Sequence, residues 1–320
     1  MSAHPLAGAF SVEASARRVR HYRYVEERVM RMLGGWIALT PELPVKVLFG
    51  RHVWDCAQHA DLWGRRLPEL RAAAQQSEPA NDQVVQVLDR LEARDGPTES
   101  LERVVGVYRV LKPHLLATYQ AHLAVANPVY EPPTRRILER CIAEERRHVA
   151  AGAAVLVRLL TDEQARRRTA AWEGVLGEAL TRAGGVTGDE AAPGRAFDTG
   201  AADPSRDLVA LHSVFDPAVV APDLQAAIDD HVRALAEGDT ARLIEQIAEP
   251  ARASALEACG RPAAGQRYEV VAQAKVGAYR LIKLRLRGPE GCWLVVERWE
   301  SVDGRWRVAA AERLTPSGGR

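Results

Sequence analysis

The chain has 320 residues, 47% of them hydrophobic and 27% charged, which is typical of globular proteins, and this length predicts two domains, with one large domain as the alternative. The formal net charge is +1, so no overall field favours nucleic acid or an anionic membrane as a partner. No apolar run approaches the roughly 20 residues that span a bilayer, and residues 1–18 lack a signal-peptide pattern, which excludes a membrane or secreted protein from our expectations.

The N-terminal part of the chain, residues 1–183, has the periodicity of helices. In the first segment, apolar residues recur at alternating steps of three and four from Val19 to Trp36. Such spacing predicts a helix that buries one stripe of its surface. Gly34-Gly35 and then Thr40-Pro41 predict its end.

Two further helices are predicted in the following segment. The first spans about Pro44 to Leu70, because its apolar residues follow the same spacing. The polar stretch Gln75 to Gln83 is expected to be a crossover connection, and a short amphipathic helix from Val84 to Arg94 follows it.

Three more helices complete the predicted helical part. One starts near Thr98 and continues to His122, with a kink expected at Pro113 because proline lacks a backbone donor. The next opens at Pro132-Pro133. The last begins at a capping box formed by Thr161 and Gln164 and ends at Gly184-Gly185.

Beyond residue 183 the composition changes twice. Residues 184–207 are rich in Gly, Ala, Asp and Pro without periodicity, which predicts a flexible linker. Residues 208–320 begin with helical patterns at Leu224 to Ala236 and Thr240 to Ile247, and end in alternating segments, such as YRLIKLRLR, CWLVVERW and WRVAAAER, that predict antiparallel strands. Helices followed by strands indicate an α+β layout for this C-terminal domain.

Several acidic and histidine side chains lie on the predicted buried stripes. Glu26 stands between Tyr22 and Val29, where an apolar residue would pack, and a buried carboxylate is costly unless it is paired or bound to a metal. Glu145 and His148 are three residues apart and can reach one cation from a single helix face. In the stretch HVWDCAQHAD, His52, Asp55 and His59 likewise share one side of a helix and are candidates for binding a metal.

The helix order, the crossover and the Glu-x-x-His motif at Glu145 to His148 resemble the ferritin-like superfamily over about residues 14–160. Its di-metal members use one Glu from each of two helices and a Glu-x-x-His from each of the other two. The resemblance implies an all-α ferritin-like four-helix bundle with extra helices. It implies Glu26 as the first-helix ligand and an intact motif on the fourth helix.

This sequence departs from the family pattern at two positions. Cys56 replaces the Glu of the second-helix motif, although His59 is present and Asp55 is adjacent. The third helix has no carboxylate between Glu102 and Glu131, so only neutral polar groups and histidines such as His122 are available there. The resemblance therefore implies an incomplete set of metal ligands for iron or manganese, made up of Glu26, His59, Glu145, His148, Asp55 and His122.

The residues leave three outcomes open: one bound ion, two bound ions, or none. In the metal-free alternative, Glu26 pairs with an arginine or a histidine and His59 bonds to Glu144 or Glu145, so that the polar core sets helix register only. The four cysteines form no CxxC pair and indicate reduced thiols in a cytoplasmic protein. Cys56 is most simply a packed thiol.

The C-terminal domain resembles the cone-shaped α+β fold of ketosteroid isomerase, nuclear transport factor and polyketide-cyclase-like proteins. The residues that carry this resemblance are the helix with Gly-Asp at Ala227 to Leu243 and the closing strand GRWRVAAAER. Enzymes of this fold keep an acid or base inside the cone. His231, Tyr268, Tyr279 and Glu297 are candidates, but they form no recognisable constellation, which favours binding or dimerisation over catalysis.

Two functional hypotheses follow from these patterns. The first is a diverged non-haem iron oxidoreductase or oxygenase that acts on a small organic substrate. The second is a metal-free binding or scaffold protein whose two domains hold a ligand or a partner. In both cases we expect a small-molecule partner, no nucleic acid and no membrane, and a homodimer is a further expectation.

Overall fold

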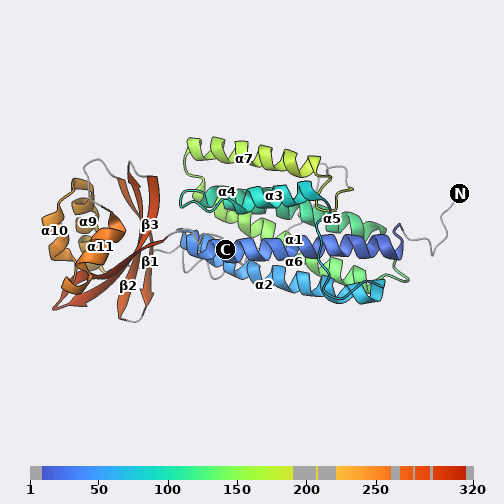
Figure 1. Cartoon of the computed structure of the whole chain (residues 1–320), viewed down its shortest axis with the longest axis horizontal. Helices are drawn as coiled ribbons and strands as arrows, with labels where there is room; N and C mark the ends of the chain where they lie inside the picture. The colour runs from blue at the N-terminus through green and yellow to red at the C-terminus, as the bar shows by residue number, and fades with distance from the viewer. Residues whose placement is uncertain are drawn as a thin grey trace. The chain divides into compact units, whose positions relative to one another are not determined.

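The computed structural model describes residues 9–189, 207, 221–260, 267–276, 278–288 and 291–314. They form two compact units, one mostly helical and one with a four-stranded antiparallel sheet (Figure 1). The predicted change from helices to strands along the chain is therefore confirmed. Most of the predicted linker, residues 184–207, lies outside the described residues.

The long helices of the N-terminal unit run alongside one another (Figure 1). No helix among the described residues is long and apolar enough to cross a membrane. The elements are α1 (Val12–Leu39), α2 (Leu43–Arg66), a 3-10 turn (Leu67–Leu70), α3 (Asp82–Glu92), α4 (Ser100–Val105), a π-helix (Gly106–Leu111), α5 (Lys112–Val125), α6 (Pro132–Leu159) and α7 (Glu163–Arg182).

Helix α1 buries the predicted stripe and ends at the predicted Thr40-Pro41. Val19, Tyr22 and Leu33 are fully buried, as is Glu26 among them. Gly34-Gly35 and then Thr40-Pro41 were predicted to end the helix, which runs through the two glycines and stops at Leu39, directly before Thr40. The cost of about 1 kcal/mol for each helical glycine is outweighed because Leu33 and Trp36 pack on either side of the pair.

The third long helix differs from the prediction in its interior. It was expected to be continuous from near Thr98 and kinked at Pro113, but a π-helix, Gly106–Leu111, interrupts it just before that proline. A π-turn inserts an extra residue and is frequent at functional sites. Within this turn the Tyr108 ring packs directly on Gly152 of α6 (Pro132–Leu159), where no side chain intervenes.

Helix α7 begins at a side-chain cap and ends before two glycines, as predicted, although a different residue provides the cap. Asp162, rather than the expected Thr161, caps α7, and its side chain accepts a hydrogen bond of 2.6 Å from the backbone N–H of Ala165. The helix ends before Gly184 and Gly185, both with positive φ, as predicted. Residues 184–189, expected to open the linker, instead pack on the helical unit, because Val186 is 1% exposed.

The C-terminal unit consists of helices that cover one face of a sheet with strand order β1-β2-β3-β4. The alternation of Ile282, Leu284 and Leu286 points these side chains into its core, as the sequence predicts. Helix α11 was not predicted from the sequence. The elements are α9 (Pro222–Glu237), α10 (Thr240–Gln246), a 3-10 turn (Glu249–Ala251), α11 (Arg252–Cys259), β1 (Arg267–Val276), β2 (Tyr279–Gly288), β3 (Gly291–Val302) and β4 (Arg305–Leu314).

The hairpin between β3 and β4 has a tight turn. Val302 pairs with Arg305, which leaves a two-residue loop. Both loop residues, Asp303 and Gly304, have positive φ, at 51° and 73°. This conformation is that of a type I′ turn, which matches the twist of the paired strands.

We predict that Gly152→Ala destabilises the helical unit by about 1–3 kcal/mol, because the added methyl group overlaps the Tyr108 ring. Gly34→Ala is the matched control, since its methyl group would meet nothing within 4 Å, and we expect it to stabilise by up to about 1 kcal/mol. Urea unfolding followed by circular dichroism measures both. Equal effects for the two variants would contradict the close packing of Tyr108 on α6.

Candidate metal centre

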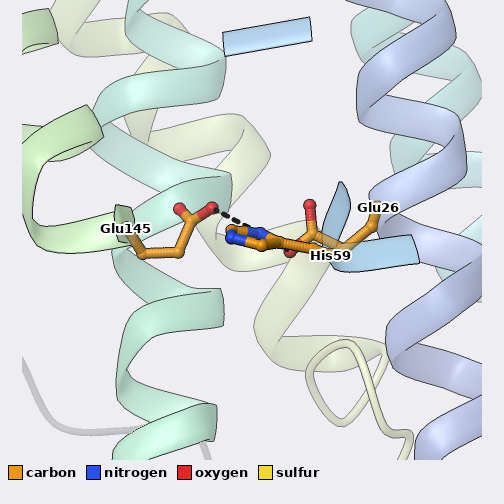
Figure 2. A group of neighbouring side chains, drawn as sticks. All are labelled: Glu26, His59 and Glu145. Atoms are coloured by element: carbon orange, nitrogen blue, oxygen red, sulfur yellow. Dashed lines mark hydrogen bonds and ion pairs between the residues drawn. The ribbon is translucent and has the colours of Figure 1, made fainter. Parts of the chain in front are cut away.

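Three buried side chains from three helices converge inside the helical unit. They are Glu26 of α1, His59 of α2 and Glu145 of α6, and Figure 2 shows them pointing toward one another. Each offers one ligand atom, and these atoms all lie within 4.8 Å of one another. All three residues are 0% exposed. The convergence of Glu26 with Glu145, which the resemblance implies, is therefore present in the structure.

Local helix geometry explains which acid of the fourth helix enters the site. The sequence offers Glu144 and Glu145 next to each other on α6. Glu145 shares the buried stripe with Cys141 and His148, at spacings of four and three. Glu144 lies about 100° further round the helix, and its side chain remains 14% exposed.

The His59 imidazole is held at both ring nitrogens. Its Nδ1 lies 2.9 Å from Glu26 Oε1 and 3.8 Å from Glu145 Oε1. Its Nε2 lies 2.7 Å from Glu144 Oε2. The pairing of His59 with Glu26 and Glu144 is the polar core that the metal-free alternative predicts. It also orients Nδ1 toward the two carboxylates that could share a cation with it.

A lysine missed by the sequence analysis lies in the same cluster. Lys112, the first residue of α5, donates a hydrogen bond of 2.6 Å from Nζ to Glu145 Oε1, and both side chains are 0% exposed. Its Nζ also lies 3.5 Å from Cys56 Sγ. A signal was present in the sequence: position 112 continues the steps of three and four that join Tyr108 to Leu115. Buried lysines are rare and need a partner, but this spacing does not show which acid pairs with Lys112.

The charges in the cluster are mutually stabilised. Burial by itself opposes ionisation of Glu145, but Lys112 and His148 outweigh it and hold the pKa of Glu145 well below 4.5. Burial likewise opposes a charge on Lys112, yet Cys56 and Glu145 raise its pKa well above 10.5. Burial raises the pKa of the Cys56 thiol, which is therefore neutral near pH 7.

The same balance applies to His59. Burial lowers the pKa of its imidazole, but the groups around the ring outweigh that effect and raise the pKa well above 6.5. These groups are Cys141, Glu26 and Glu144. In the metal-free protein the ring therefore carries a proton that is shared with acidic neighbours on two helices.

His148 links Glu145 to a further predicted candidate, Asp55. His148 Nδ1 lies 3.3 Å from Glu145 Oε1, and its Nε2 lies 3.1 Å from Asp55 Oδ2. Burial raises the pKa of Asp55, but His148 outweighs this effect and lowers it to about 2. The structure therefore places Asp55 as the partner of His148, on the far side of that ring from Glu145.

His122, the remaining predicted candidate, lies apart from the three converging residues. Its Nδ1 is 3.1 Å from the hydroxyl of Tyr22, and its ring makes an edge contact with Phe10. Burial lowers the pKa of His122 to about 4, so that the ring is neutral. Helix α5, which also contains His122, supplies Lys112 and Tyr119 to the site in place of this histidine.

Two carboxylate oxygens in the cluster are free of hydrogen bonds among the described residues. Tyr119 donates to Glu26 Oε1 at 2.9 Å, and Trp63 donates to the Tyr119 hydroxyl at 3.3 Å. Glu26 Oε2 and Glu145 Oε2 are buried and have no such partner. Buried unpaired carboxylate oxygens are costly, and a bound cation is one way to satisfy them.

The histidine that opens the HVWDCAQHAD stretch extends this polar core. His52 Nδ1 lies 2.7 Å from the Tyr108 hydroxyl, and its ring centroid lies 3.9 Å from that of His148. Burial and the neighbouring His148 lower the pKa of His52 to about 3. A neutral His52 can therefore stack beside His148 without repulsion between two charged rings.

The C-terminal unit has a separate buried polar cluster. His231 Nε2 lies 3.1 Å from Glu297 Oε1, and its Nδ1 lies 2.9 Å from Gln246 Oε1. The other Glu297 oxygen accepts a hydrogen bond of 2.9 Å from the Trp299 indole. His231 and Glu297 are separate candidates in the sequence, and the fold brings them together with each polar atom paired. This arrangement is typical of a satisfied core pair.

Comparisons of the chain with protein families, with curated proteins and with solved structures find no match.

We predict that Lys112→Met lowers the free energy of unfolding by about 3–5 kcal/mol, because it leaves Glu145 charged and buried without its partner. Adding Glu145→Gln should recover most of this loss, since the second change removes the uncompensated charge. Urea unfolding of the single and double variants measures both effects.

The control is Arg65→Ala, which breaks the exposed ion pair with Asp61 and should leave stability nearly unchanged. Strictly additive losses in the Lys112 and Glu145 variants would show that these two groups do not interact.

We predict that Glu297→Gln lowers the pKa of His231. Burial lowers this pKa, and Glu297 is the first of the groups that outweigh it and raise the value above 6.5. Without that charge, burial should hold the pKa below 6.5. The stabilisation from the pair is fully present below pH 6.5 and is lost as pH rises through the folded-state pKa.

Histidine side-chain NMR titration measures this pKa, with His231→Asn used to assign the resonance. An unchanged His231 pKa in Glu297→Gln would contradict the pairing.

Proposed function

We propose that the helical unit is a diverged ferritin-like four-helix bundle that holds one iron or manganese ion. The ligands are Glu26, His59 and Glu145. In this proposal the protein is an oxidoreductase that uses dioxygen to oxidise a small organic substrate. The observation that carries it is the convergence of two carboxylates and an imidazole, from three helices, on one buried point.

The donor set fits this class of ion. Carboxylate oxygens suit manganese, and imidazole nitrogen suits iron. Glu26 Oε2 and Glu145 Oε2 are buried without hydrogen-bond partners among the described residues, so each has an oxygen available for a cation. The complete two-ion set of the ferritin-like pattern does not fit, because Cys56 and the third helix provide no carboxylate.

The surrounding residues orient the proposed ligands. Glu144 accepts from His59 Nε2, which would leave Nδ1 as the ligand atom once its proton is lost. Tyr119 binds one oxygen of Glu26, so the other oxygen can turn to a cation. A bound iron or manganese ion would supply the redox chemistry that no side chain of the cluster provides.

Lys112 and His148 act in the same way on the other carboxylate. Both contact Glu145 Oε1, at 2.6 Å and 3.3 Å, which leaves Oε2 for a cation. All three side chains are completely buried, so bulk water is kept from the site. A dry site strengthens the electrostatic interactions of every charged group within it.

A second candidate function is a metal-free scaffold whose polar core sets helix register. The observation that favours it is the pair of cations already present: the Lys112 ammonium on Glu145 and the protonated His59 between Glu26 and Glu144. These groups neutralise carboxylates without a metal ion. Metal analysis separates the two candidates.

We predict that purified protein reconstituted with Fe(II) or Mn(II) retains one ion per chain, and that His59→Asn abolishes retention because one of three ligands is lost. Plasma mass spectrometry after removal of loosely bound metal measures the stoichiometry. His122→Asn is the matched control, because His122 is also buried but contacts Tyr22 instead of the cluster.

Retention well below one ion per chain, unchanged by reconstitution, would favour the scaffold. If metal is retained, oxygen uptake by the iron form in the presence of candidate organic substrates tests the redox step. No uptake above that of His59→Asn would contradict the oxidoreductase assignment and leave metal binding intact.

A further inference from the structure

Both departures from the ferritin-like ligand pattern meet at one side chain. Cys56 stands where the resemblance implies a second-helix glutamate, and its Sγ lies 3.5 Å from Lys112 Nζ. The third helix, which lacks its glutamate, supplies Lys112 itself at the start of α5. The same Nζ lies 2.6 Å from Glu145 Oε1. A single ammonium group therefore contacts the position of one missing acid and comes from the helix that lacks the other.

We infer that the Lys112 ammonium takes the place of a second metal ion, so that the centre accepts at most one ion and Lys112 sets this number. The inference rests on the proposed metal binding by Glu26, His59 and Glu145. It adds that Lys112 determines how many ions bind, although Lys112 itself is not a ligand of the bound ion.

Electrostatics and donor chemistry support this role. A protonated lysine has three donors and no lone pair, so it repels a metal ion and cannot ligate one. Glu145 offers Oε1 to Lys112 and keeps Oε2 free, as a carboxylate shared between two cations would.

Burial fixes the ammonium in this position. The Lys112 side chain is 0% exposed, and its helix neighbours Leu111, Leu115 and Leu116 are buried as well. Moving the ammonium group elsewhere would leave both it and Glu145 buried without a partner, which is strongly unfavourable. The π-helix just before Lys112 inserts an extra residue, which changes the register at which α5 presents its side chains to the core.

Manganese loading of the full-length protein tests the inference. Wild-type protein should retain at most one Mn(II) per chain, whereas Lys112→Glu should retain two, because it restores a carboxylate and removes the repelling charge. Plasma mass spectrometry counts the ions. Electron paramagnetic resonance should show an isolated Mn(II) in the wild type and an exchange-coupled pair in Lys112→Glu, since ions in two-metal sites lie about 3.5–4 Å apart.

Arg109→Glu is the control for added negative charge. Arg109 lies in the preceding π-helix with its side chain 39% exposed, so the same change in charge should leave the ion count unchanged. Circular dichroism verifies folding. Should Lys112→Glu fail to fold, Lys112→Gln replaces it: its amide oxygen should admit a second, weaker ion that appears only at higher Mn(II) concentration.

Each outcome has one meaning. Two ions in the wild type, or a folded Lys112 variant that binds no more than the wild type, would overturn the inference. No ion in the wild type together with binding in Lys112→Glu would support the inference and reject the proposed function. No binding by either protein would overturn both.

Discussion

The ion pair between Lys112 and Glu145 is the interaction on which the interior of the helical unit depends. Each group alone would be a charge removed from water, at a cost of several kcal/mol. Together, 2.6 Å apart and fully buried, they make ionised forms of both stable. Because Lys112 belongs to α5 and Glu145 to α6, the pair also fixes how these two helices align along their axes.

From this pair the polar network extends to the other long helices. Glu145 contacts His148, which binds Asp55 of α2, while His59 of α2 lies between Glu26 of α1 and Glu144 of α6. Four helical segments are thus joined by directional contacts inside an otherwise apolar core. Such contacts depend on correct register, since a shift of one residue would separate the charged partners. The arrangement that sets register also leaves two carboxylate oxygens unpaired at one point.

The metal and metal-free alternatives differ in what satisfies those oxygens. The His59 proton and the Lys112 ammonium stabilise the acids from two sides. Loss of the His59 proton frees a ring nitrogen for a ligand bond, whereas the protonated Lys112 has no lone pair to offer. A lysine in the core therefore limits which ligand bonds the bundle can form, but it does not prevent metal binding at His59. In the C-terminal unit the buried His231 and Glu297 side chains instead satisfy one another and their neighbours.

The sequence by itself determined the order of helices and strands, the burial of Glu26, and the pairing of Glu145 with His148 on one face. Those features depend on local periodicity, which assigns each side chain a direction around its own helix or strand. Only the tertiary structure decided that Lys112 meets Glu145, that Asp55 turns to His148, and that His122 lies apart with Tyr22. Periodicity carries no information about the height at which two helices face each other, so partners on different helices are settled by packing.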